Sequence, residues 1–177
     1  MKTLLILAVL SLSAFAADRA TIAAAESACG PSNIQFEVKA ENAQHPTALA
    51  PEGKALVYVV EVFEKPENQI SRPTVKVGLD GNWVGANKSN SYFFFPVNPG
   101  DHHLCMAWQS THKRYSRQVA LTNFSAESGK AYYFTARIIE HDEGLGAWFT
   151  VDLGPVNGDE GQLLVASSAF STSHPKK

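Results

Sequence analysis

The sequence is poor in cysteine and has no excess of charge of either sign. Its 177 residues include two cysteines, 15 lysines and arginines, and 17 aspartates and glutamates, for a formal charge of −2. Two cysteines are too few for a disulfide-framework miniprotein or a four-thiolate zinc site. The near-neutral charge lacks the basic excess typical of nucleic-acid-binding proteins. Since 45% of the residues are hydrophobic, the chain can bury a core. We therefore expect one globular domain and no nucleic-acid partner.

The N-terminus has the pattern of an export signal. Lys2 supplies a positive charge, residues 4–12 form an apolar run, and residues 14–16 (AFA) form a small-residue cleavage site. The alternative is a buried N-terminal helix. The pattern predicts a Sec-type signal peptide over residues 1–16 and a mature protein in the periplasm or secreted. No later apolar stretch has the length of about 20 residues that crosses a bilayer, so we expect no transmembrane helix in the mature chain.

Export changes how the two cysteines are interpreted. An oxidising compartment favours disulfides, and Cys29 and Cys105 are the only available pair. The alternatives are two separate thiols, or a lipid anchor on Cys29. A lipid anchor is disfavoured because Cys29 lies far beyond the apolar run and Glu26 occupies the third position before it. We predict a Cys29–Cys105 disulfide.

Alternating apolar and polar residues predict strands along most of the mature chain. Residues 34–38 alternate with period two, and residues 55–63 form a β-branched and aromatic run that suits a strand buried on both faces. Asp80-Gly81 between two apolar segments predicts a hairpin turn. Further segments of strand length lie at 75–79, 92–97, 102–108, 119–124, 132–138 and 147–153.

One short helix is expected over residues 162–169, capped by Asn157 or Asp159. Regularly spaced strands with turns between them are typical of an all-β sandwich. Parallel pairing requires long crossovers, which the short spacing does not provide. We therefore predict an all-β, antiparallel β-sandwich of about eight strands with one short C-terminal helix. The predicted organisation is a loose N-terminal segment at 17–32, one domain at 33–170 and a flexible tail at 171–177.

The order of several motifs resembles the bacterial family called domain of unknown function 2846. The motifs are residues 53–59 (GKALVYV), 77–81 (VGLDG), 83–85 (WVG), 90–93 (NSYF), 97–104 (VNPGDHHL) and 126–134 (AESGKAYYF). The resemblance covers roughly residues 50–168. It implies an exported or envelope-located β-sandwich of transthyretin-like or immunoglobulin-like type. It implies no catalytic residues, because the family has no established activity.

His102, His103 and Cys105 are the strongest candidates for metal or catalytic chemistry, since all three types of side chain bind zinc. Adjacent residues of a strand point to opposite faces, however, so His102 should face away from the other two. The sequence also contains no G-x-S-x-G and no H-E-x-x-H motif. We therefore expect no catalytic residue, no metal and no cofactor, and we keep a metal-dependent or hydrolytic enzyme using the His102-His103 region as an alternative.

Aromatic residues mark a possible ligand or partner surface at Trp83, Phe93, Phe94 and Phe95. Because three of them are consecutive, both faces of that strand carry aromatic rings. One face should meet the core, and the other needs a neighbouring element, a ligand or a partner to cover it. The leading hypothesis is a non-enzymatic exported β-sandwich that binds a small ligand or an envelope partner. A further alternative is a structural envelope protein that self-associates through edge strands; the oligomeric state stays open.

Overall fold

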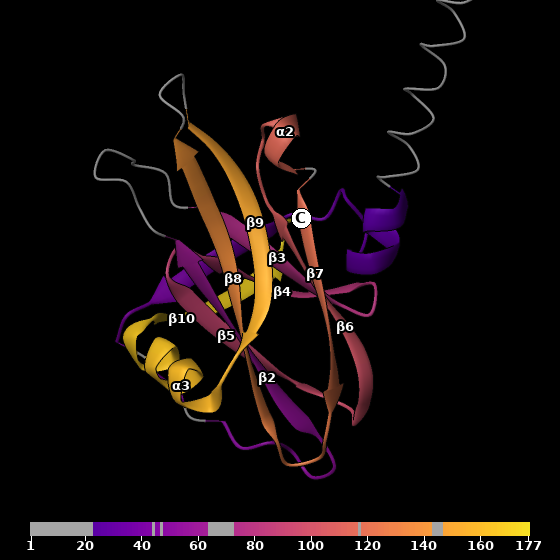
Figure 1. Ribbon diagram of the computed structural model, residues 1–177, viewed down its shortest axis with the longest axis vertical. Helices are drawn as coiled ribbons and strands as arrows, with labels where there is room; N and C mark the ends of the chain where they lie inside the picture. Colours follow the sequence, from indigo (N-terminus) through magenta and orange to yellow (C-terminus); the bar gives the residue numbers. More distant parts are fainter. Residues whose placement is uncertain (1–22, 44, 47, 64–72, 117, 143–146) are drawn as a thin grey trace, which may run out of the picture.

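Two β-sheets form the body of the protein in the computed structural model, which describes residues 23–177 except 44, 47, 64–72, 117 and 143–146 (Figure 1). The first sheet contains, in spatial order, β1 (Phe36–Glu41), β10 (Ala169–Pro175), β5 (Ser91–Val97), β2 (Ala55–Phe63), β8 (Ala131–Asp142) and β9 (Ala147–Val156). The second contains β4 (Asn82–Lys88), β3 (Thr74–Leu79), β6 (Gly100–Trp108) and β7 (Val119–Ala126). The prediction of a mostly β fold is confirmed, with ten strands among the described residues where about eight were expected.

The expected antiparallel pairing is wrong at two places in the six-stranded sheet. Strand β2 pairs in parallel with β8, and β10 pairs in parallel with β5. Both pairs obey the requirement for a long crossover. Between β2 and β8 the chain forms all four strands of the second sheet and also β5 of the first, and β10 follows the helix α3 (Gly158–Ser167). Non-consecutive strands can therefore meet without a helix after each strand.

The predicted flexible tail at 171–177 is also wrong, because β10 extends through it to Pro175. Strand β10 pairs with β1 over six residue pairs, from Phe36 opposite Pro175 to Glu41 opposite Phe170. The Phe170 ring packs on neighbouring aromatic residues, and Ser171 is buried. Serine and threonine dominate this strand, so its sequence has almost no apolar alternation.

The N-terminal region is partly described. The predicted signal peptide and residues 17–22 lie outside the described residues. Within the segment expected to be loose, residues 23–29 are helical and Cys29 is buried. None of the helices in the described ranges is both long and apolar enough to cross a membrane.

Local turn and cap chemistry agrees with the sequence. Asp80 and Gly81 both have positive φ, 50° and 79°, as a tight hairpin between β3 and β4 requires. Helix α3 begins earlier than predicted. Its N-cap is Asn157, whose side-chain oxygen accepts from the backbone N–H of Glu160 at 2.9 Å. A second short helix, α2 (Lys113–Ser116), joins β6 to β7.

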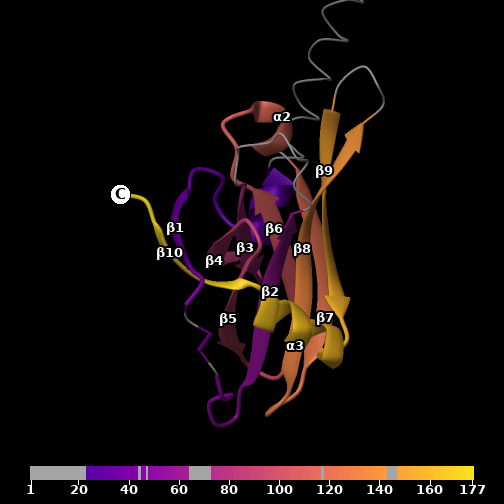
Figure 2. The ribbon, with the colours of Figure 1, turned by 90° about the vertical axis from the view of Figure 1, so that its left-hand side faces the viewer.

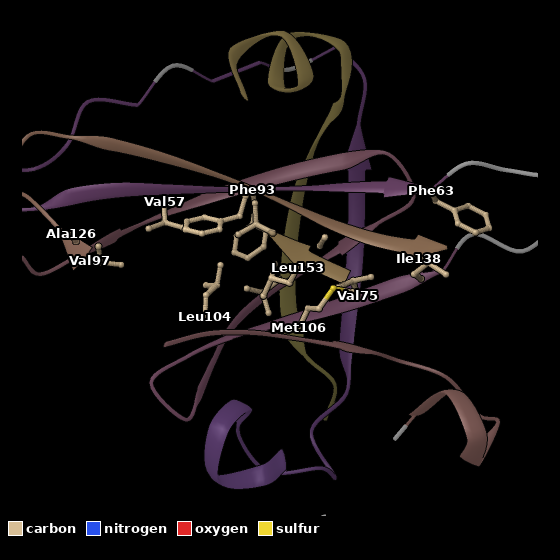
Figure 3. Close-up of a cluster of buried hydrophobic side chains, with 14 of the residues drawn as sticks. Val57, Phe63, Val75, Phe93, Val97, Leu104, Met106, Ala126, Ile138 and Leu153 are labelled. Carbon is tan, nitrogen blue, oxygen red and sulfur yellow. The ribbon is translucent and has the colours of Figure 1, made fainter. Parts of the chain in front are cut away.

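Two apolar clusters hold the layers together. The larger lies between the sheets and includes Val57, Phe93, Leu104 and Phe134 (Figure 3). The smaller lies on the outer face of the six-stranded sheet, where Leu164 and Val165 of α3 pack against it. Figure 2 shows α3 from this side, lying against the sheet at β2 and β8. At β2 the six-stranded sheet is therefore covered on both faces, and this explains the long apolar run of that strand.

Candidate ligand site beneath helix α3

Three tyrosines from adjacent strands meet on the outer face of the six-stranded sheet. Tyr58 on β2 is paired with Tyr133 on β8, and Tyr92 on β5 is paired with Val60, two residues along β2. Side chains alternate between the faces of a strand, so Val57 and Val59 enter the core between the sheets while Tyr58 and Val60 face outward. We refer to Tyr58, Tyr92 and Tyr133 as the tyrosine cluster.

Aromatic contacts fix the positions of these rings. The Tyr58 and Tyr133 rings are stacked, with centroids 5.0 Å apart and an interplanar angle of 17°. The ring centroids of Phe94 and Tyr58 are 5.3 Å apart, and those of Phe170 and Tyr92 are 5.4 Å apart. Such offset and tilted pairs are the favoured arrangements of aromatic rings. The bodies of the tyrosines are thus held by packing.

Helix α3 and the segment before β2 cover the tyrosine cluster. A Cβ atom at Gly161 of α3 would lie 2.2 Å from Cγ of Tyr133, so only glycine allows the helix to approach this closely. Ala48 and Ala50 pack on the same apolar cluster. At its margin the exposed His45 ring lies parallel to Tyr92, with centroids 6.5 Å apart.

The hydroxyl of Tyr92 is the unusual group of this site. Tyr92 is fully buried, and its hydroxyl has no hydrogen-bond partner among the described residues. An unsatisfied buried polar group typically costs about 1–3 kcal/mol. An apolar ring of the same shape would avoid this cost, so the hydroxyl calls for an explanation.

Burial raises the pKa values of all three tyrosines, because it disfavours the charged phenolate. Repulsion between phenolates also raises the pKa of Tyr58 through Tyr133 and that of Tyr92 through Tyr58. A hydrogen bond from the backbone N–H of Ala48 partly offsets the rise at Tyr58. The hydroxyls therefore remain protonated at neutral pH and can act as hydrogen-bond donors.

The four aromatic residues predicted as a ligand surface do not form one surface. Phe93 and Phe95 stack at 5.6 Å within the core between the sheets. Phe94 points to the opposite face and joins the tyrosine cluster. Trp83 lies elsewhere, on β4 of the four-stranded sheet. Its Nε1 donates to the carbonyl of Pro31 at 2.9 Å, and the Lys76 ammonium lies 4.2 Å from its ring centroid.

The predicted pair Cys29 and Cys105 forms a disulfide, with Cα atoms 5.3 Å apart. It fastens the helical segment at 23–29 to the outer face of the four-stranded sheet. Gly78 on β3 permits this contact, because a Cβ atom there would lie 2.3 Å from the carbonyl oxygen of Cys29. Cys105 is therefore committed to a structural bond.

His102 and His103 do not form a site with Cys105. Asp80, in the β3–β4 turn, contacts both: its Oδ2 lies 2.7 Å from His102 Nδ1, and its Oδ1 accepts from the His103 backbone N–H at 2.8 Å. The other ring nitrogen of His102 lies 2.8 Å from the carbonyl of Asn98. Within the described ranges, no group of three or more His, Cys, Asp or Glu side chains could hold a metal ion.

The contacts of His102 favour its protonated form. Desolvation lowers its pKa, but the bonds to the Asp80 carboxylate and the Asn98 carbonyl outweigh it and raise the pKa overall. For Asp80, desolvation raises the pKa, whereas the His103 backbone N–H and the His102 ring outweigh it and lower the pKa. The His102 ring thus ties the β3–β4 turn to the turn before β6.

A buried acid lies in the core between the sheets. Glu61 on β2 is fully buried, and in the described part of the chain neither carboxyl oxygen has a hydrogen-bond partner. Burial raises its pKa well above the ordinary value. The backbone N–H of Ser89 opposes this rise, although it falls outside hydrogen-bond geometry. Asn87, also buried, donates through Nδ2 to the carbonyl of Val59 at 2.9 Å, and its Oδ1 has no partner within the described ranges.

The sequence contains part of the signal for the tyrosine cluster. Strands at 55–63, 92–97 and 132–138 are all predicted, and each predicted strand contains or directly adjoins one of the tyrosines. The parallel pairing of β2 with β8 brings the rings together, and no local pattern reveals it. No family model matches the chain, and no curated protein or solved structure matches it.

Proposed function

We propose that the protein is an exported, non-enzymatic β-sandwich of transthyretin-like or immunoglobulin-like type, related to the domain of unknown function 2846 family, that binds a small ligand beneath α3. One observation carries the proposal: the hydroxyl of Tyr92 is buried among apolar side chains and has no hydrogen-bond partner among the residues that the structure describes. A bound ligand would satisfy this hydroxyl and offset the cost of burying it.

The disulfide supports export without a lipid anchor. Disulfides persist in oxidising compartments, and residues 1–16 have the pattern of a signal peptide. The sulfur of Cys29 is bonded to Cys105, so it is not available to carry a lipid. A periplasmic or secreted location follows from this proposal.

The contacts of His102 count against its use as a general base in the alternative of an enzyme using the His102-His103 region. A general base requires a ring nitrogen that can reach the substrate. Both ring nitrogens of His102 face protein acceptors at 2.7 and 2.8 Å. Its geometry suits a structural tie between two turns.

A ligand screen by NMR tests the proposed function. Protein purified from the periplasm or medium is mixed with pools of small metabolites, and the amide signals of α3 and of residues 48–50 are followed. We expect at least one class of compound to shift these signals. If no pool shifts them, ligand binding beneath α3 is wrong. Light scattering of the same sample tests the alternative of a self-associating envelope protein, which would show a mass that rises with concentration.

A further inference from the structure

We propose that the ligand beneath α3 is an apolar monocarboxylic acid, bound with its carboxylate at the hydroxyls of Tyr58 and Tyr92 and its hydrocarbon part against the apolar cluster beneath α3. This inference rests on the proposed function and specifies its ligand class. It follows from the donors that the site offers, from its walls and from the way α3 is attached.

Tyrosine hydroxyls supply the hydrogen-bond donors of the site. The Tyr92 hydroxyl has no partner in the described part of the chain. Tyr58 lies on the neighbouring strand β2, two residues from the position opposite Tyr92, and its hydroxyl can also donate a hydrogen bond. Two donors side by side suit a head group with two acceptor oxygens. Hydrogen bonds to an ionised acceptor are roughly twice as strong as neutral ones, and this favours a carboxylate.

The walls of the site are apolar. Leu56 and Val60 form its floor on β2, Leu164 and Val165 face them from α3, and Phe170 borders it from β10. A hydrophilic ligand would lose its hydration on these surfaces without regaining hydrogen bonds. A hydrocarbon chain or ring would gain about 25 cal/mol for each Å² of apolar area that it buries.

Helix α3 is attached lightly enough to admit such a ligand. Of its ten residues, only Gly161 is fully buried, and Leu163 is 69% exposed. Leu164 and Val165 are only partly buried against the cluster. Elements with few buried apolar contacts open at low free-energy cost. An outward shift of α3 would open the outer face of β2 and β8, beside Tyr92 on β5, and the apolar part of the ligand would replace the contacts that the helix gives up.

Calorimetric titration of the full protein with decanoate, acetate and methyl decanoate tests this ligand class. Decanoate should bind. Acetate, which lacks the hydrocarbon part, and methyl decanoate, which lacks the charge, should each bind at least tenfold more weakly. Binding of methyl decanoate as tight as that of decanoate would overturn the carboxylate assignment. Binding of acetate as tight as that of decanoate would overturn the inference that the hydrocarbon part binds the apolar cluster.

The variant Tyr92→Phe removes the hydroxyl and keeps the ring. We expect decanoate affinity to fall about ten- to hundredfold, as for a lost hydrogen bond to a charged group. The unfolding midpoint should stay equal or rise, because an unsatisfied polar group is removed from the ligand-free protein. Unchanged decanoate affinity would overturn the proposal.

Tyr132→Phe is the matched control. Tyr132 precedes Tyr133 on β8, packs toward the core between the sheets, and accepts the backbone N–H of Glu127 at 2.9 Å. Removing the Tyr132 hydroxyl should leave decanoate affinity unchanged. If Tyr92→Phe and Tyr132→Phe lost the same amount of affinity, the cause would be reduced stability and the proposed site would be wrong.

If the NMR screen finds a ligand beneath α3 and decanoate fails to bind, the ligand class is wrong and the proposed function stands. If nothing binds there, both are wrong.

Discussion

Replacing Glu61 by glutamine should change stability in a way that depends strongly on pH. The carboxyl is fully buried without a partner among the described residues, and burial raises its pKa well above the ordinary value of 4.5. The unfolded chain ionises at the ordinary pKa, and the folded protein ionises at the raised pKa. Between these two pH values the unfolded chain has released the proton and the folded protein keeps it. Stability therefore falls as pH rises through this window. Glutamine has the same shape and does not ionise, so the variant should lack this fall.

The size of the effect follows from proton linkage. One pKa unit corresponds to about 1.4 kcal/mol, so wild type should lose about 1.4 kcal/mol per pH unit within the window. The loss begins near pH 4.5 and ends where the folded carboxyl ionises. A domain has a total stability of roughly 5–15 kcal/mol, so a change over two pH units is easily measured. Below the window Glu61→Gln should match wild type within about 1 kcal/mol, because both side chains are then neutral.

Urea unfolding at half-unit steps from pH 4 to pH 8, with the disulfide intact, measures this difference. The stability of Glu61→Gln relative to wild type should rise steadily with pH. Glu52→Gln, at an exposed position before β2, is the control and should run parallel to wild type. If Glu61→Gln also runs parallel, or loses stability relative to wild type as pH rises, the folded protein holds Glu61 as a partnered carboxylate and the reasoning fails.

Three further predictions concern the contacts that hold the four-stranded sheet. Replacing Cys29 and Cys105 by serine should cost about 4.5 kcal/mol, the loop-closure entropy for a separation of 76 residues; an unchanged urea midpoint would contradict it. The raised pKa of His102 implies stabilisation that is complete below its ordinary value of 6.5 and is lost as pH rises through the folded value. Melting temperatures from pH 5 to pH 9 should show this loss in wild type and not in His102→Gln. Gly78→Ala should cost at least about 2 kcal/mol, because its Cβ would lie 2.3 Å from the carbonyl oxygen of Cys29. Gly154→Ala, with nothing within 4 Å of its Cβ, should cost clearly less in the same melts.

Local signals in the sequence were sufficient for most individual elements. Alternation of apolar and polar residues located most of the strands, and the Asp80-Gly81 pair located the β3–β4 turn. Asn157, one of the two residues predicted as the cap of α3, is its N-cap. Each of these depends on interactions within a few residues along the chain, or on the contrast between a buried and a solvated face. Strand β10 escaped prediction because its serines and threonines give no such contrast, although pairing with β1 orders it.

The sequence by itself therefore determined most of the strands, the β3–β4 turn and the only possible pairing of two cysteines. The tertiary structure decided which strands became neighbours. Parallel pairing of β2 with β8 stacked Tyr58 on Tyr133, β5 added Tyr92, and α3 packed over β2 and β8. The same assembly separated Trp83 from Phe93–Phe95 and committed both ring nitrogens of His102 to protein acceptors. These outcomes depend on contacts between residues far apart in the chain, and the register of distant strands is set by the packing of the whole core.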